Sequence, residues 1–292
     1  MTSFKNFAPI LSENVPLARL TSMRVGGPVR FLFEPRSQAE LASLLDVLRR
    51  NNILVRVIGA GSNVVAGDDG FPGAVIRLAG DFAHLSFEGP AVTAGAAVPL
   101  PRFVRESAER GLSGAEGLVG IPGTLGGALV MNAGGRWGEI CRLVRAARVM
   151  TLQGGVTDVA PEKLAFGYRH STLVGSVVLS AVFQLQQSDR QAVEAATRSF
   201  LDKKRATQDL GAASAGCIFK NPPGGLSAGA LIDRAGLKGV QVGGAKVSPL
   251  HANFLVNTGS ASAKDVLDLA RLVRSRVLET SGVDLEFEVQ LW

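Results

Sequence analysis

Two glycine-rich stretches constrain what this chain can fold into more than any other feature of its sequence. The first, Gly59-Ala60-Gly61-Ser62-Asn63, comes directly after the apolar run 53–58, and the second is Gly120-Ile121-Pro122-Gly123-Thr124-Leu125-Gly126-Gly127-Ala128. Because glycine has no side chain, such loops let backbone N–H groups approach phosphate oxygens closely. Two of them predict a pyrophosphate held between the loops, with the Thr124 hydroxyl and the nearby Asn132 amide adding polar contacts.

The first loop alone is a weak signal. The dinucleotide fingerprint of a doubly wound fold needs a third glycine where this chain has Val64, and no Gly-Lys-Ser or Gly-Lys-Thr of a P-loop occurs. A tight turn, in which Asn63 adopts unusual backbone angles, explains this stretch equally well.

The pattern of apolar residues and caps predicts an α+β fold. Helices are expected over 37–50, where Ser37 and Glu40 form a capping box, and over 263–280, where Ser262 and Asp265 form another. Further helices are expected over 101–110, 189–205 and 228–235, and strands over 53–58, 74–78, 143–152, 176–186, 253–257 and 285–289. Helices and strands alternate, but many strands are short and adjacent, which favours α+β over a doubly wound sheet.

The composition excludes several classes of protein. The 292 residues, 46% of them hydrophobic, suffice for two domains, and two cysteines do not make a disulfide framework or a zinc site. No secretory signal and no run of about 18 apolar residues is visible, so we expect a cytoplasmic protein that does not enter a membrane. The net charge of +6 is scattered, and one tyrosine and two tryptophans offer few platforms for stacking bases. Nucleic acid is therefore not expected as a partner, nor is a metal, since the three histidines lack ligand spacing.

The motifs resemble those of a known flavoprotein family. The two glycine loops, followed by Met-Asn-Ala-Gly-Gly at 131–135, look like the FAD-binding module of the vanillyl-alcohol-oxidase (PCMH) type. They resemble most closely the UDP-N-acetylenolpyruvoylglucosamine reductases of peptidoglycan synthesis, in the shorter, type II form. The likeness continues through Thr-Ser-Met-Arg-Val-Gly-Gly-Pro (21–28), Gly-Tyr-Arg-His-Ser (167–171), Gly-Cys-Ile-Phe-Lys-Asn-Pro (216–222), Ile-Asp-Arg-Ala-Gly-Leu-Lys-Gly (232–239) and Leu-Glu-Phe-Glu-Val (285–289).

This resemblance implies an organisation and a reaction. An FAD-binding domain over 1–189, with lobes of about 1–52 and 53–189, would precede an α+β substrate-binding domain over 190–292, whose C-terminal strand returns to the active site. The expected reaction is the reduction of UDP-N-acetylglucosamine enolpyruvate to UDP-N-acetylmuramate by FAD, with NADPH as the hydride donor. The expected partners are these small molecules alone, and the expected state is a monomer.

The resemblance also implies which residues bind FAD and substrate. The cofactor-binding set is Arg24, Gly59, Ala60, Gly61, Ser62, Asn63, Gly120, Ile121, Pro122, Gly123, Thr124, Gly126, Gly127, Ala128 and Asn132. The substrate-binding set is Tyr168, Arg205, Gln208, Lys220, Asn221 and His251. A solvated helix end is an alternative for the basic run at 203–205 and Gln208, and a core position is an alternative for His251.

Three residues are expected to carry the chemistry. Reduction of an enol ether conjugated to a carboxylate needs a hydride, stabilisation of negative charge and a proton. The resemblance implies that Arg169 and Glu288 stabilise the charge, and that the proton donor is a serine where this chain has Cys217. A thiol, with a reference pKa of about 8.5, keeps a donor at that place. Taken singly, Arg169 could be a surface ion pair, Glu288 part of a solvated strand face, and Cys217 a small core residue.

Two other functions remain open at this point. A different FAD-linked oxidase or dehydrogenase could share the fold, although no histidine or cysteine is placed to tether a flavin. A non-catalytic nucleotide-binding protein is the remaining alternative.

Overall fold

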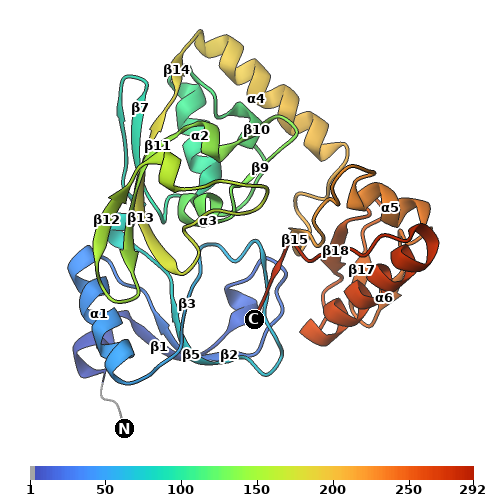
Figure 1. Ribbon diagram of the computed structural model, residues 1–292, viewed down its shortest axis with the longest axis horizontal. Helices are drawn as coiled ribbons and strands as arrows, with labels where there is room; N and C mark the ends of the chain where they lie inside the picture. Colours follow the sequence, from blue (N-terminus) through green and yellow to red (C-terminus); the bar gives the residue numbers. More distant parts are fainter. Residues whose placement is uncertain (1–3) are drawn as a thin grey trace. The chain divides into compact units, whose positions relative to one another are not determined.

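The computed structural model describes residues 4–292, which form two compact units (Figure 1). Unit 1 comprises the described residues up to Glu13, with Phe31–Ala60 and Gly73–Lys204, and unit 2 comprises Asn14–Arg30, Gly61–Pro72 and Arg205–Trp292.

A five-stranded antiparallel sheet forms the centre of unit 1. Its order is β12-β11-β13-β7-β6. The strands are β6 (Leu85–Glu88), β7 (Ala91–Gly95), β11 (Val144–Thr151), β12 (Val156–Val159) and β13 (Ser176–Gln184). Helices α2 (Leu100–Glu109) and α3 (Leu125–Val130) share one hydrophobic core with this sheet, in which Phe103 and Phe183 are fully buried. That packing places the second glycine loop, which leads into α3, on a rigid support.

A second sheet has the order β1-β2-β5-β3. Its strands are β1 (Leu11–Pro16), β2 (Pro28–Phe33), β5 (Phe71–Ile76) and β3 (Val55–Val57), and β3 runs parallel to β5. Helix α1 (Gln38–Arg50) buries its leucines in the core that contains Phe31 and Phe33. The first glycine loop begins at Gly59, two residues after the end of β3, which is shorter than the predicted strand over 53–58.

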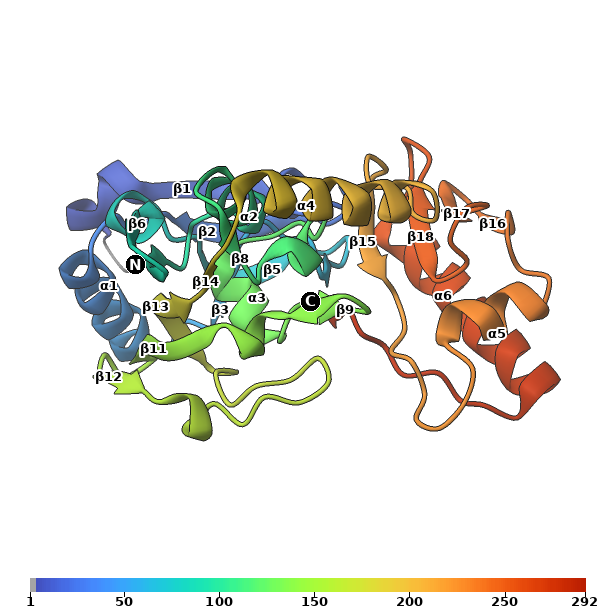
Figure 2. The same cartoon turned by 90° about the horizontal axis from the view of Figure 1, so that it is seen from above.

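Two short strand pairs and one long helix complete the strands and helices of unit 1. Strand β8 (Leu112–Ser113) pairs with β14 (Gln186–Gln187), and β9 (Gly134–Gly135) pairs with β10 (Gly138–Glu139). Helix α4 (Arg190–Arg205) follows β14, and Figure 2 shows it as one long continuous helix.

Unit 2 is built on an antiparallel sheet in the order β15-β18-β17-β16. The elements are β15 (Ser214–Cys217), α5 (Ala228–Arg234), β16 (Gln241–Val242), β17 (Ala245–Val247), β18 (Phe254–Asn257) and α6 (Ala263–Ser281). Helix α6 packs against β16, β17 and β18 (Figure 1). Strand β4 (Val64–Val65) runs parallel to β19 (Gln290–Leu291), so the segment after the first glycine loop pairs with the C-terminal residues.

Helix termini follow the predicted caps, with one difference. At α6, Ser262 and Asp265 make both bonds of the capping box, and Gly282 ends the helix in the left-handed conformation. At α1, Ser37 accepts a hydrogen bond from the Glu40 N–H at 3.2 Å, but the Glu40 carboxylate accepts from the N–H of Arg36 instead of Ser37. The predicted capping box is therefore only half formed there.

The units divide the chain differently from the predicted domains. Residues 14–30 and 61–72 join unit 2 because they bond to C-terminal residues. Gly67 N–H donates to the Trp292 carbonyl at 3.0 Å, and Ala263 N–H donates to Asp68 at 2.8 Å. The assignment of FAD binding to 1–189 and of substrate binding to 190–292 stays a prediction.

Candidate active site

The second glycine loop is held by backbone bonds to the first residue of α2 and to the segment just before it. Leu100 N–H donates to the Gly123 carbonyl, and Leu125 N–H donates to the Val98 carbonyl, both at 2.9 Å. Gly123 has a φ of +119°, a conformation that other residues adopt only with strain, and Thr124 caps the N-terminus of α3. The loop therefore has a fixed shape that depends on glycine.

The first glycine loop meets the second inside unit 1. A Cβ added to Gly59 would overlap the hydroxyl oxygen of Thr124, so the Gly59 backbone lies directly against the Thr124 side chain and leaves no room for a side chain of its own. In the described part of the chain, the N–H groups of Gly59, Gly123 and Thr124 donate no hydrogen bond. Two glycine-rich loops whose backbone N–H groups are available as donors suit the diphosphate of a dinucleotide. These residues therefore fit FAD.

The second half of the first loop belongs to unit 2. Gly61 has a φ of +61°, and its carbonyl accepts from the N–H of Ser22 at 3.1 Å. The Ser22 hydroxyl also donates to the Ser214 carbonyl at 2.6 Å, which connects the segment 21–25 to strand β15. Arg24 lies on this segment with an exposed side chain and a φ of +58°.

Asn132 uses its side chain to support a neighbouring turn. The residue is 3% exposed; its Nδ2 donates to the Gly167 carbonyl at 2.9 Å, and its Oδ1 accepts from the N–H of Cys141 at 3.3 Å. Sequence reasoning placed this amide on the cofactor. The structure instead gives both ends of the amide partners within the chain, and one partner lies two residues before Arg169.

Arg169 stands at the corner of a tight turn in unit 1. Gly167 and His170 exchange two backbone hydrogen bonds, of 3.0 and 3.3 Å, which leaves Tyr168 and Arg169 at the tip. Arg169 has a φ of +53°, and its guanidinium lies 4.9 Å from the centre of the Tyr168 ring. A left-handed arginine costs about 1–2 kcal/mol, and such strain persists where the surroundings impose it, most often at functional sites.

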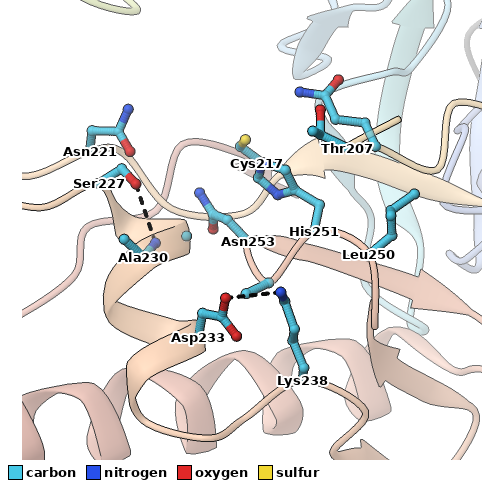
Figure 3. Close-up of a pocket in the computed structure, with 13 residues that line it drawn as sticks. Thr207, Cys217, Asn221, Ser227, Ala230, Asp233, Lys238, Leu250, His251 and Asn253 are labelled. Atoms are coloured by element: carbon cyan, nitrogen blue, oxygen red, sulfur yellow. Dashed lines mark hydrogen bonds and ion pairs between the residues drawn. The ribbon is translucent and has the colours of Figure 1, made fainter. Parts of the chain in front are cut away.

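Cys217 ends strand β15 at the wall of a cavity in unit 2. The pairing of β15 with β18 is irregular between Ser214 and Cys217, where Gly216 has a φ of +75°, and such a bulge redirects the side chain that follows it. The cavity measures about 370 Å3 (Figure 3). Its lining residues are Thr207, Gln208, Cys217, Asn221, Ser227, Gly229, Ala230, Asp233, Lys238, Leu250, His251, Ala252 and Asn253.

Four predicted residues therefore share this cavity, namely Gln208, Cys217, Asn221 and His251. Figure 3 shows α5 forming one wall, where Ser227 caps the helix and Asp233 pairs with Lys238 at 2.9 Å. Asn221 fixes the start of this wall, because its Oδ1 accepts from the N–H of Ala228 at 3.0 Å.

Three other predicted substrate residues do not line the cavity. Tyr168 belongs to the turn over 167–170 in unit 1. The Lys220 ammonium lies 3.4 Å from the exposed carboxylate of Glu286. Arg205 is the exposed last residue of α4.

The segment around Glu288 lies beside Cys217 in unit 2. Glu288 N–H donates to the Ile218 carbonyl at 2.8 Å, and its own carbonyl accepts from Asn63 at 3.2 Å. Phe287 stacks on buried Phe219, with ring centres 5.2 Å apart, and the Glu288 side chain is partly buried. The predicted strand over 285–289 is thus a single bridge, and regular pairing begins at β19. Asn63, Cys217 and Glu288 are brought together along the backbone.

Arg169 belongs to unit 1, whereas Cys217 and Glu288 belong to unit 2. The convergence of the three side chains on one reacting centre stays a prediction.

Comparisons with known proteins cover nearly the whole chain. Residues 29–160 match a family described as an FAD binding domain, and residues 208–292 match the C-terminal domain of UDP-N-acetylenolpyruvoylglucosamine reductase. The chain is 44% identical over 279 residues to UDP-N-acetylenolpyruvoylglucosamine reductase 2 of Symbiobacterium thermophilum, which covers 95% of this chain and 90% of that protein.

The chain belongs to the UDP-N-acetylenolpyruvoylglucosamine reductase family.

Other members of the family are also similar to this chain over most of its length. The Bacillus subtilis reductase is 39% identical over 281 residues, covering 95% of this chain and 92% of its own. The crystal structure of the reductase from Thermus caldophilus matches with a TM-score of 0.84 and 41% identity, over 95% of this chain and 97% of that chain. The α+β fold with an FAD-binding domain and a C-terminal domain of this family is therefore confirmed.

Sequence reasoning missed several residues of the cavity in this family member. Asp233 and Lys238 lie within the motif Ile-Asp-Arg-Ala-Gly-Leu-Lys-Gly, where an acid and a base flank the left-handed Gly236 after α5. Asn253 is a polar residue in the apolar run before β18 and is 3% exposed. It bonds both backbone groups of Phe219, at 3.0 and 2.8 Å. The available sequence signal was a polar amide at the start of the predicted strand over 253–257.

Two further properties concern the described residues 4–292. No group of three or more His, Cys, Asp or Glu side chains there is arranged to hold a metal ion. None of the helices in that range is both long and apolar enough to cross a membrane.

His251 is a titratable residue in the wall of the cavity. Burial, and secondarily the charge of Lys238, lower the pKa of its imidazole, and its buried Nδ1 makes no hydrogen bond within the described chain. The ring packs against Phe254 with centres 4.6 Å apart. The imidazole is therefore neutral at neutral pH.

Acidification should consequently destabilise unit 2 through His251. The unfolded chain binds the imidazole proton more readily than the folded chain. The stability contributed by neutral His251 is therefore complete above the ordinary histidine pKa of about 6.5 and is lost as pH falls through the lower folded value. The melting temperature of His251→Gln should drop less between pH 7.5 and 5 than that of the wild type. His84→Gln, at an exposed position, serves as the control. An equal drop in His251→Gln and the wild type would contradict the assignment.

Proposed function

We propose that the protein reduces the enolpyruvyl group of UDP-N-acetylglucosamine enolpyruvate to give UDP-N-acetylmuramate, using FAD and NADPH, in the synthesis of peptidoglycan precursors. The observation that carries this proposal is the match to reductases of that name along 95% of the chain, together with the FAD-binding domain over 29–160. When bound, FAD accepts a hydride from NADPH and supplies it to the enolpyruvyl group.

The chain's own residues would bind the reactants and handle charge and protons. The backbone donors at Gly59, Gly123 and Thr124 would hold the FAD diphosphate, with the exposed side chain of Arg24 contributing a cation from the 21–25 segment. The cavity lined by Gln208, Asn221 and His251 would hold the nucleotide substrate. The domain roles, FAD binding in 1–189 and substrate binding in 190–292, follow from these assignments.

Arg169 and Glu288 would stabilise the negative charge that develops when the hydride reaches one alkene carbon. The guanidinium is a fixed cation that can grip the substrate carboxylate or the developing enolate. The partly buried Glu288 carboxyl would polarise that carboxylate, in its protonated form or through water.

Cys217 would complete the reduction by giving its thiol proton to the other alkene carbon. The net reaction adds a hydride from NADPH and a proton across the carbon–carbon double bond, and solvent returns a proton to the thiolate. Cys217 lines the cavity beside Asn221 and His251, which is where a proton donor is needed.

We further propose that the enzyme acts in the cytoplasm as a monomer, on small molecules, without nucleic acid or membrane. The support is the chemistry of the substrates, since NADPH and nucleotide sugars are cytoplasmic metabolites, and the scattered distribution of the basic residues.

The two half-reactions can be observed separately. Under anaerobic conditions, NADPH should bleach the visible absorption of the purified flavoprotein, and the enolpyruvyl nucleotide added next should restore the oxidised spectrum. If the nucleotide leaves the flavin reduced, the proposed substrate is wrong; if the protein holds no flavin, the proposed function fails altogether.

A further inference from the structure

A buried lysine lies directly behind the second glycine loop. Lys204, in the last turn of α4, is 6% exposed, and its Nζ donates to the Val119 carbonyl at 2.5 Å. The ammonium lies 5.8 Å from the centre of the Trp137 ring, and Trp137 stacks on Phe200 of α4 at 5.4 Å. The lysine is thus held between α4, the β9–β10 turn and the residues that lead into the loop.

The hydrogen bond from Lys204 to the Val119 carbonyl also affects the next N–H group along the chain, because of peptide geometry. The Val119 carbonyl and the Gly120 N–H belong to one planar trans peptide, so they point in opposite directions. A bond that fixes the carbonyl therefore also fixes the direction of the N–H. Gly120 has a φ of +73°, and its N–H donates no hydrogen bond within the described chain.

The same segment is also packed tightly against the β9–β10 turn. A Cβ on Gly117 would overlap the Trp137 carbonyl oxygen, and Ile121 N–H donates to the Leu118 carbonyl at 3.2 Å. The turn that carries the Val119–Gly120 peptide is therefore clamped by Trp137 and Lys204 together.

We propose that Lys204 is a positioning residue for the FAD diphosphate, which orients the Val119–Gly120 peptide so that the Gly120 N–H is presented as an anion donor. The identity of the ligand rests on the proposed function. A charged donor also polarises the peptide it binds, which strengthens the opposite N–H as a donor.

A role in packing alone would not require an amine at position 204. Burial lowers the pKa of Lys204 to about 8, so holding the charge inside the protein is unfavourable, and an apolar side chain would fill the space at lower cost. An ammonium that acts on the loop explains why a lysine is present despite that cost.

The test compares FAD binding by apoprotein variants. Lys204→Met keeps the length of the side chain and removes the donor, Lys204→Arg keeps a charged donor, and Lys203→Met is the control on the exposed neighbour. We expect about a tenfold rise in the dissociation constant for FAD in Lys204→Met, and changes of less than threefold in Lys204→Arg and Lys203→Met.

The pH dependence of FAD binding provides a second readout. In the wild type, affinity should fall several-fold between pH 7 and 9.5 as Lys204 loses its proton, whereas Lys204→Arg should show no such fall because a guanidinium stays charged. The other charged groups on the surrounding elements are Glu116, Arg136, Glu139, Arg190, Glu194, Arg198, Asp202, Lys203 and Arg205. As classes, carboxylates and guanidiniums titrate outside this range, and Lys203→Met checks the remaining amine.

The outcomes separate the two proposals. Unchanged FAD affinity in Lys204→Met would overturn the positioning role and leave the proposed function intact. If Lys204→Met does not fold, an identical pH dependence in the wild type and Lys204→Arg would overturn it instead. Failure of the wild type to bind FAD at all would remove the proposed function.

Discussion

Replacing Cys217 with alanine is expected to leave bleaching of the flavin by NADPH unchanged and to slow its reoxidation by the enolpyruvyl nucleotide by about 10²- to 10⁴-fold. Alanine removes the thiol proton and little volume, at the end of β15 in the wall of the cavity. Because NADPH oxidation needs no proton donor at the substrate, only the second half-reaction should suffer. Anaerobic stopped-flow absorbance measures the two steps separately.

Cys217→Ser is the matched control for this experiment. A hydroxyl at the same place retains a proton donor, so reoxidation should stay within about tenfold of the wild-type rate. Equal losses of both half-reactions in Cys217→Ala would indicate damage to the fold and count against a catalytic thiol. Full activity in Cys217→Ala would show that the proton comes from elsewhere.

Replacing Arg169 with glutamine should slow reoxidation by about 10²- to 10³-fold, because a fixed cation would no longer face the charge that develops on the substrate. The control is Arg276→Gln, which removes an exposed guanidinium from an ion pair on α6. Stopped-flow absorbance with saturating nucleotide measures the loss.

Arg169→Gly separates chemistry from backbone strain at the same turn. Glycine adopts a φ of +53° without penalty, so this variant should be as stable as the wild type or more stable, by up to about 1 kcal/mol, and still fail in reoxidation. A variant that loses both stability and activity would mean that Arg169 serves the fold of the turn, not the reaction.

Local sequence signals predicted much of the fold. The caps at Ser37 and Ser262 and the 3.6-residue spacing of apolar residues locate α1 and α6 to within a residue, because these signals lie within the element itself. The short strands were located less well. β3 is half its predicted length and pairing near Phe287 reduces to one bridge, since strand ends depend on partners distant in sequence.

Some features of the candidate site could likewise be predicted from the sequence, and others could not. That Gly59 and Thr124 meet could be foreseen, because two glycine loops imply a shared ligand. That Asn132 turns its amide to Gly167 could not, because an amide has donors and acceptors for either use and only the fold decides between them. The Lys204 contact with Val119 was equally hidden, since a basic run at a helix end is usually solvated.

The discontinuous make-up of unit 2 has a consequence for biogenesis. Strand β4 has its partner in β19, and Gly67 bonds to the Trp292 carbonyl, so contacts span more than two hundred positions of the chain. During translation, residues 64–67 must wait without these partners until positions 290–292 have left the ribosome. Their closure is expected to be a late and slow event, in which nascent chains expose unpaired apolar segments to chaperones.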